Sequence, residues 1–201
     1  MPSIGSDQYI TINGRSEGLY KDRGSKFIAI ALPADTVDKA MDHLDRLKKE
    51  YHDARHHCYA YKIGPGEENY RLNDDGEPSG TAGKPIFGQI LSYGLSDILI
   101  IVIRYFGGTL LGTGGLIQAY KASAQSAIMS AKITERKVCK SLTLKFTYDY
   151  MSLAMRIVKQ EILEILKQEL TESCRININV RSSKYKQEKE IFENTYGIEL
   201  T

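Results

Sequence analysis

The chain has 201 residues, of which 42% are hydrophobic and 26% are charged, a composition that indicates a folded protein rather than a disordered one. Its 27 basic and 25 acidic residues leave a net charge of +2, too small for a general attraction to nucleic acid or anionic lipid. The longest apolar run, residues 98–103, is far shorter than the roughly 20 residues that cross a bilayer. We therefore expect no membrane partner.

The cysteines and the first residues predict the compartment. Cys58, Cys139 and Cys174 are an odd number with wide spacing, which is typical of a reducing compartment and gives no disulfide framework. The N-terminal segment carries Asp7 and Glu17 and lacks the apolar core of a secretory signal. Both observations predict a cytoplasmic protein.

Strands and helices alternate along the first two thirds of the chain. In chain order we expect strands at residues 9–12, 18–21 and 26–32, a helix at 37–50, a strand at 55–63, a helix at 85–93, a strand at 97–103 and a helix at 116–131. The strand at 97–103 is apolar without alternation, so we expect it to be buried on both faces. Residues 64–83 are predicted to be a long loop, and loops of that length are usually functional or disordered.

A basic, polar stretch at residues 132–140 marks the expected boundary between two domains, 1–134 and 138–201. Beyond it we expect a strand at residues 141–148, a helix at 151–160, a strand at 174–180, a helix at 184–194 and a short strand at 197–200. Residues 161–170 are ambiguous, because they either continue the preceding helix or form the first arm of a hairpin. The second choice gives the order βαββαβ, which is ferredoxin-like.

Residues 74–83 form the first of two glycine-rich loops in which we look for chemistry. Its polar side chains, with the lysine that follows, are Asp74, Asp75, Glu77, Ser79, Thr81 and Lys84. The clustered carboxylates can supply oxygen ligands to a hard cation or take part in proton transfer. They can equally build turns and cap the helix that starts near Pro85. The spacing matches neither an EF-hand nor a Walker phosphate-binding loop.

Residues 104–115 form the second glycine-rich loop, between the buried strand and a helix. A helix N-terminus presents free N–H groups and a partial positive charge, and Arg104 can pair with a carboxylate or a phosphate. Its partner is therefore either the acidic trio of the first loop or an external phosphate-type anion. The glycines suit close approach of a ligand and tight internal packing equally well. The residues of this loop that we place at the site are Arg104, Tyr105, Gly107, Gly108, Gly112, Gly114 and Gly115.

A third cluster of chemically capable residues runs from Arg55 to Tyr61. His56, His57 and Cys58 are metal-ligating types, but neighbours on a strand point to opposite faces and cannot chelate one ion together. The sequence has no CxxC spacing and no nucleophile elbow, so we predict no metal site, no cofactor and no catalytic nucleophile. We expect Cys58 inside the protein, with His57 and Tyr59 outside, where a tyrosine can stack on bases.

The two loops together resemble the motifs of a known family. The runs DDGEPSGTAG at 74–83, RYFGG at 104–108 and LGTGGL at 111–116 are similar to those of the YigZ/IMPACT family, as are SKFI at 25–28 and HCYA at 57–60. The resemblance implies an α+β protein with an N-terminal ribosomal-protein-like β-α-β domain that has a mixed sheet. It also implies a C-terminal ferredoxin-like domain similar to domains of elongation factor G. Eukaryotic relatives are linked to translational control through a ribosome-associated regulator.

We therefore expect a non-enzymatic binding or regulatory protein of the translation apparatus, whose partner is RNA or a ribosome-associated protein. The alternative is a protein that binds a small molecule or a phosphate-type anion, including an enzyme of unknown reaction. The predicted surface combines Arg55, His57 and Tyr59 with the residues of the two loops named above. Positive and negative charges balance up to Ile133, so any RNA site is expected to be a local patch.

Overall fold

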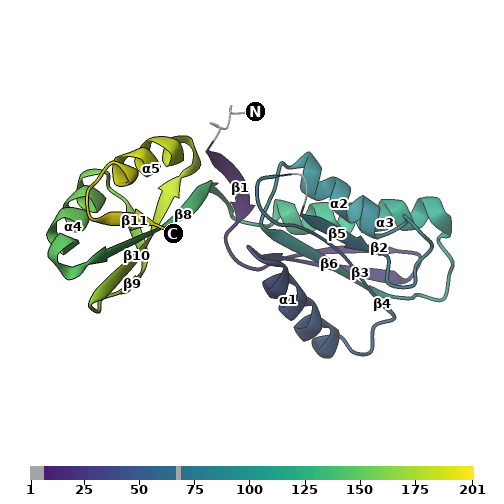
Figure 1. The fold of residues 1–201 in the computed structure, drawn as a ribbon. Helices are drawn as coiled ribbons and strands as arrows, with labels where there is room; N and C mark the ends of the chain where they lie inside the picture. The colour runs from purple at the N-terminus through teal and green to yellow at the C-terminus, as the bar shows by residue number, and fades with distance from the viewer. Residues whose placement is uncertain (1–6, 67–68) are drawn as a thin grey trace. The chain divides into compact units, whose positions relative to one another are not determined.

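The computed structural model describes residues 7–66 and 69–201, which form two compact units. One unit holds residues 9–136, and the other holds residues 137–201 with Asp7 and Gln8 (Figure 1). The predicted α+β class is confirmed, because both units combine antiparallel sheets with helices. No helix in the described part of the chain is long and apolar enough to cross a membrane.

A five-stranded sheet forms the centre of the unit of residues 9–136. Its strands lie in the order β2 (Ser16–Asp22), β3 (Ser25–Pro33), β6 (Ile98–Tyr105), β4 (His56–Lys62) and β5 (Tyr70–Asn73). Each pairing is antiparallel, so the sheet is not mixed in direction, and one isolated parallel bridge joins Ile10 to Leu95. The central strand β6 is buried from Ile98 to Arg104, as its uninterrupted apolar sequence predicts.

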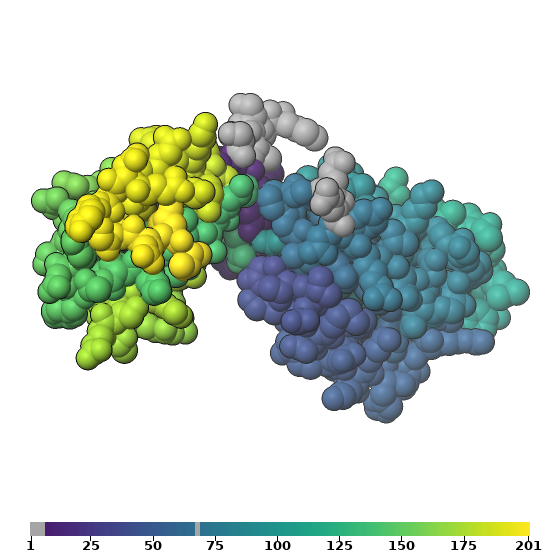
Figure 2. Space-filling model, viewed as in Figure 1, coloured from purple at the N-terminus to yellow at the C-terminus, as the bar shows by residue number. Residues whose placement is uncertain are grey.

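Helices cover both faces of this sheet. On one face, α2 (Gly83–Ser92) and α3 (Gly112–Met129) pack against the side of β6 that carries Ile100 and Val102. On the other face, α1 (Val37–Glu50) packs with Leu44 and Leu47. The outward, polar side of α1 is part of the surface of this unit (Figure 2). The sheet therefore has two buried faces, which decides where several candidate side chains lie.

Three features of this unit differ from the predicted elements. β5 lies within the segment expected to be a continuous loop, and β7 (Ile133–Lys137) lies within the expected boundary, where it pairs with β1 (Gln8–Ile12). Both β5 and β7 are short and largely exposed, so neither shows the apolar alternation that marks a strand. α3 begins at Gly112 rather than at Leu116, so the last glycines of the second loop are helical.

The unit of residues 137–201 has the ferredoxin-like order of elements. In sequence these are β8 (Cys139–Thr147), α4 (Met151–Gln160), β9 (Glu164–Glu169), β10 (Ser173–Arg181), α5 (Tyr185–Glu193) and β11 (Ile198–Leu200). The strands form one antiparallel sheet in the order β11-β8-β10-β9. The ambiguous residues 161–170 thus contain a strand and do not continue α4. Ala154 and Val158 of α4 and Phe192 of α5 belong to the core of this unit.

Candidate functional site

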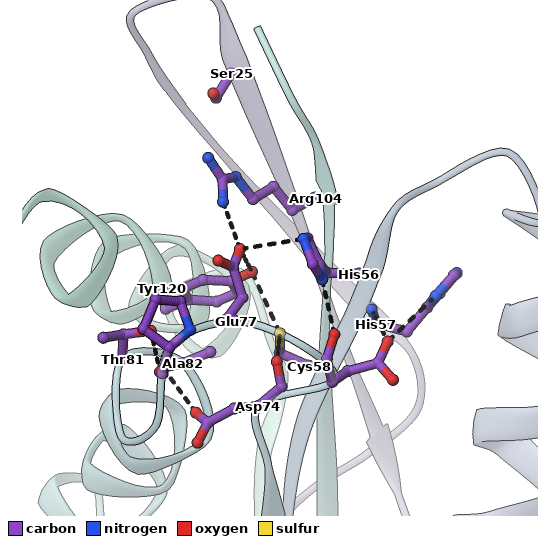
Figure 3. A network of polar contacts seen from close by, with 12 residues as sticks. Ser25, His56, His57, Cys58, Asp74, Glu77, Thr81, Ala82, Arg104 and Tyr120 are labelled. Carbon is purple, nitrogen blue, oxygen red and sulfur yellow. Dashed lines mark hydrogen bonds and ion pairs between the residues drawn. The ribbon is translucent and has the colours of Figure 1, made fainter. Parts of the chain in front are cut away.

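A buried ion pair joins the two glycine-rich loops. Nη1 of Arg104, near the end of β6, lies 2.6 Å from Oε1 of Glu77, in the segment between β5 and α2 (Figure 3). The two side chains are 7% and 4% exposed, so water and salt screen the pair only weakly. The guanidinium also lies 5.4 Å from the ring centroid of Phe27 and 5.6 Å from that of Phe106. Of the two predicted partners, the internal acidic loop is the one that Arg104 contacts.

Glu77 is the centre of a hydrogen-bond network that links three elements of the fold (Figure 3). Its Oε1 accepts a hydrogen bond from the hydroxyl of Tyr120 in α3 at 2.8 Å and lies 4.0 Å from Nε2 of His56 in β4. Nδ1 of His56 lies 2.7 Å from the carbonyl oxygen of Asp75, and because a carbonyl only accepts, Nδ1 carries a proton. Burial raises the pKa of Tyr120 far above its ordinary value. The phenol therefore stays protonated, and its hydroxyl is the donor of the hydrogen bond to Glu77.

Cys58 belongs to the same network and is not reactive there. Its Sγ lies 3.0 Å from the carbonyl oxygen of Asp74 and 3.2 Å from the hydroxyl of Tyr120. Burial raises the pKa of the Cys58 thiol well above its ordinary value. The thiolate is the nucleophilic form, so this cysteine stays an inert, hydrogen-bonded core residue.

Asp74 serves the local structure of the first loop. Its carboxylate accepts hydrogen bonds from the backbone N–H groups of Gly80, Ala82 and Gly83 at 2.8, 3.0 and 2.8 Å. Ala82 and Gly83 form the start of α2, where unsatisfied N–H groups normally require a cap. Asp74 therefore fixes the first loop to the helix that follows it.

The side chain of Asp75 also accepts a hydrogen bond from the backbone. Its Oδ2 accepts a hydrogen bond from the N–H of His57 at 2.6 Å, so of the acidic trio only Glu77 contacts Arg104. Within residues 7–66 and 69–201, no three or more His, Cys, Asp or Glu side chains are grouped so that they could hold a metal ion. The partners of the loop carboxylates are therefore backbone N–H groups and the side chains of Arg104, Tyr120, His56 and His57.

An apolar pocket of about 420 Å³ opens beside the ion pair. Its lining is formed by Arg55, His56, Glu77, Pro78, Arg104, Phe106, Leu110, Leu111, Gly112, Thr113 and Leu116. Leu110 is 81% exposed and Phe106 is 43% exposed, although both are large hydrophobic side chains. A concave apolar surface with exposed hydrophobic side chains at its edge is the kind of surface that binds a ligand or a partner.

Two residues predicted for the exposed surface, His57 and Tyr59, are buried instead, at 8% and 4% exposure. The expectation that they lie outside was wrong because α1 covers the sheet face opposite to Cys58. Nε2 of His57 hydrogen-bonds with the carbonyl of Tyr51, just after α1, at 3.0 Å. Neither side chain lines the pocket.

Some of the other predicted residues pack or hydrogen-bond inside the protein, and the rest are exposed. Thr81 is buried and donates to the carbonyl of Pro78 at 2.6 Å. The hydroxyl of Tyr105 donates to Asp53 at 2.8 Å, away from the pocket. Gly107 packs against Gly24, where an added Cβ would lie 1.9 Å from the carbonyl carbon of Gly24. The exposed members are Arg55, Ser79, Lys84, Gly107, Gly108, Gly112 and Gly114, of which Arg55 and Gly112 line the pocket, whereas Gly115 is half-buried.

Sequence reasoning did not assign to the site the hydrophobic residues that shape the pocket or the tyrosine that completes the network. These are Pro78, Phe106, Leu110, Leu111, Leu116 and Tyr120. A signal for two of them exists, because consecutive leucines in a glycine-rich loop are unusual where turn residues are expected.

The fold and the site define a two-unit α+β protein whose larger unit combines a buried Arg–Glu–Tyr network with an apolar pocket at the start of α3. Residues 23–128 match the Impact N-terminal domain, and the chain belongs to the IMPACT family. The match covers both glycine-rich loops, so the resemblance seen in their motifs is confirmed.

Individual relatives support this assignment. The chain is 33% identical over 182 residues to IMPACT family member YvyE of Bacillus subtilis, an alignment that covers 90% of this chain and 81% of the relative. It is 37% identical over 130 residues to IMPACT family member YigZ of Escherichia coli, and the alignment spans 64% of that relative's length. A hypothetical protein of known crystal structure is similar with a TM-score of 0.77 at 26% identity, over 98% of this chain and 97% of that one.

Proposed function

We propose that this chain is a non-enzymatic regulatory protein of the translation apparatus that binds a ribosome-associated protein through the pocket beside Arg104. The link to translation and to the cytoplasm rests on the family, whose eukaryotic members are linked to translational control through such a partner. The observation that carries the proposed binding mode is the apolar pocket itself. Leu110 stands exposed on its wall, next to an arginine whose charge Glu77 already neutralises.

The chemistry of the pocket favours a protein partner over RNA. RNA binding draws on unpaired basic side chains and on exposed aromatic rings that stack on bases. Arg104 is paired with Glu77, and the rings of Tyr59 and Tyr61 stack on each other inside the core. Besides these, the pocket lining holds a single further Arg or Lys side chain, Arg55, and a single Phe, Tyr or Trp ring, Phe106. Exposed leucine and phenylalanine side chains around a concave surface match the hydrophobic centre of a protein interface.

Co-sedimentation with ribosomes tests this proposal. Purified chain is centrifuged with ribosomes from Bacillus subtilis, the source of one relative, either unwashed or stripped of peripheral proteins by a high-salt wash. We expect the chain to pellet with unwashed ribosomes, to stay in solution with washed ones, and to pellet again when the wash fraction is restored. Equal binding to washed ribosomes would contradict a peripheral protein partner and would favour RNA.

A second candidate function, binding of a phosphate-type anion, has an observation of its own. Nε of Arg104 is buried and donates to no acceptor in the part of the chain that the structure describes. The first residues of α3, Gly112 and Thr113, line the same pocket, and no side chain caps this helix. Its free N–H groups and partial positive charge suit an anion. Glu77 argues against an anion site, because its carboxylate lies beside Arg104 in the same pocket and would repel an anion.

Thermal unfolding in phosphate, compared with chloride at equal ionic strength, separates the second candidate from the first. A phosphate concentration of about 100 times the dissociation constant adds about 2.7 kcal/mol of stability. Thr113→Asp, at an exposed position in the first turn of α3, repels an anion but is favourable to the helix dipole. Phosphate should therefore stabilise the unchanged chain and not this variant. A chain that does not respond to phosphate excludes the anion site.

A further inference from the structure

The lining of the apolar pocket beside Arg104 carries an excess of positive charge. Two arginines line it, Arg55 and Arg104, with one carboxylate, that of Glu77. Arg104 and Glu77 form the buried ion pair, so their charges balance. Arg55 is exposed, and its side chain forms no ion pair with any residue among 7–66 and 69–201. His56, the remaining titratable residue of the lining, is either neutral or positive and therefore never lowers this excess.

The turn between β2 and β3 adds positive charge on the side of the pocket where Phe106 lies. Residues 21–26, in and around this turn, include three basic residues and one acidic residue. The N–H of Gly107, which follows the lining residue Phe106, donates to Oγ of Ser25 at 3.1 Å. The backbones of Gly107 and Gly24 are also in direct contact. An acidic partner is therefore attracted to this side of the pocket as well as to Arg55.

The interior of the pocket requires a different chemistry from its charged edge. Leu110, Leu111 and Leu116 contribute apolar surface to its wall. Its volume of about 420 Å³ lies within the range of small-molecule sites, about 300–1,000 Å³, so it accepts a large aliphatic or aromatic side chain. Protein interfaces commonly combine such an apolar anchor with charged pairs at the rim, which fix the orientation of the partner. The complementary surface is a large hydrophobic side chain with carboxylates beside it.

A protein segment of this kind avoids the repulsion that a free phosphate ion meets. Phosphate inside the pocket lies against the carboxylate of Glu77, whereas a hydrophobic side chain places apolar atoms there. The carboxylate of the segment then stays outside, where Arg55 is exposed. RNA places a phosphate at every nucleotide and draws on several free cations, of which the lining offers one.

We propose that the pocket takes an acidic segment of the protein partner, in which one large hydrophobic side chain enters beside Leu110 and a carboxylate pairs with Arg55. This inference rests on the proposed function for the existence of a protein partner, but the chemistry that it assigns to the partner can be tested without ribosomes. A rim ion pair acts mainly on orientation and on the association rate, and salt screens it.

Binding of labelled synthetic peptides to the full chain, measured by fluorescence anisotropy, tests this inference. The probe is a short peptide with a central Leu-Phe pair flanked by glutamates. One matched peptide has lysines in place of the glutamates, and another has alanines in place of Leu-Phe. We expect the glutamate peptide to bind at least fivefold more tightly than the lysine peptide at ~50 mM salt, and the ratio to approach one at ~500 mM salt. The alanine peptide should bind at least tenfold more weakly than the glutamate peptide.

Two charge reversals locate the effect. Arg55→Glu should abolish the preference for the glutamate peptide. Arg156→Glu changes the net charge equally at an exposed position of α4, in the other unit, and should keep the preference. Equal binding of the glutamate and lysine peptides to the unchanged chain would overturn the inference. So would a preference that survives in Arg55→Glu.

Co-sedimentation with unwashed ribosomes distinguishes failure of this inference from failure of the proposed function. A chain that pellets with ribosomes, pellets equally well as Arg55→Glu and binds no acidic peptide overturns the inference alone. A chain that binds the acidic peptide through Arg55 but pellets with no ribosomes supports the inference and contradicts the link to the translation apparatus.

Discussion

Nη1 of Arg104 and Oε1 of Glu77 lie 2.6 Å apart in the wall of an apolar pocket, so Glu77 neutralises the charge of Arg104 before any partner arrives. The pair explains why a loop rich in acid and a loop that starts with an arginine do not form an electrostatically active cleft. What the loops present to a partner is mainly the hydrophobic surface around Leu110 and Phe106.

The first prediction concerns the stability of this ion pair. Arg104→Ala leaves Glu77 buried without its cation, and we expect a loss of about 3–5 kcal/mol in the free energy of unfolding, measured by urea denaturation. Arg15→Ala is the control, because Arg15 pairs with Glu17 on the surface and should cost no more than about 1 kcal/mol. Equal, small losses in the two variants would show that the pair is not buried.

A second prediction concerns the cap of α2. Asp74→Ala removes the acceptor for three backbone N–H groups, and we expect a loss of about 1–2 kcal/mol. Hydrogen exchange of the α2 amides should become faster than that of the α1 amides, whose cap Thr36 is unchanged. Asp35→Ala, at an exposed pair with Lys39, serves as the control. An α2 that exchanges as slowly as before would contradict the capping role of Asp74.

Most of the fold could be predicted from the sequence where a strand or helix has a strong apolar pattern. The unbroken run of β6 indicates a central strand, and the hairpin reading of residues 161–170 follows once the ferredoxin-like order is considered. β5 and β7 could not be predicted from the sequence. They are strands because their backbones hydrogen-bond to a neighbouring strand, but their mostly exposed residues form no apolar face that would indicate one. The start of α3 was placed too late, because glycines normally indicate a loop although they can occupy a helix.

The candidate site could be predicted only in part. Arg104 and Glu77 are charged residues of glycine-rich loops, so their residue types single them out. The contribution of Tyr120 depends on which turn of α3 faces the first loop, which only the tertiary structure shows. The burial of His57 and Tyr59 was predicted wrongly. Strand alternation shows that these residues share one face of the sheet, but only the whole fold shows that helices cover both faces.

A third prediction concerns the pH dependence of stability through Glu188. Burial raises the pKa of this carboxyl in the folded state above its unfolded value of 4.5. The folded state therefore binds the proton more tightly, and the stability from this group is complete below pH 4.5 and is lost as the pH rises through the folded pKa. Glu188→Gln should match the unchanged chain near pH 4 and become more stable than it towards pH 7.

The measurement for this third prediction is urea denaturation between pH 4 and pH 7. Glu190→Gln, at an exposed position on the same helix, should follow the unchanged chain at every pH. If the two curves for Glu188→Gln and the unchanged chain stay parallel over this range, the carboxyl is not perturbed by burial.

The central claim is that the hydrophobic surface around Leu110, and not the charge of Arg104, binds the partner. Its most direct measurement is the binding of Leu110→Asp to unwashed ribosomes by co-sedimentation, with Leu91→Asp as the matched control. Leu110 and Leu91 are 81% and 52% exposed, so neither substitution disturbs the core. We predict at least a tenfold loss of binding for Leu110→Asp, since a hot-spot residue of an interface costs about 2 kcal/mol or more, and no loss for Leu91→Asp. Unchanged binding of Leu110→Asp would contradict the account.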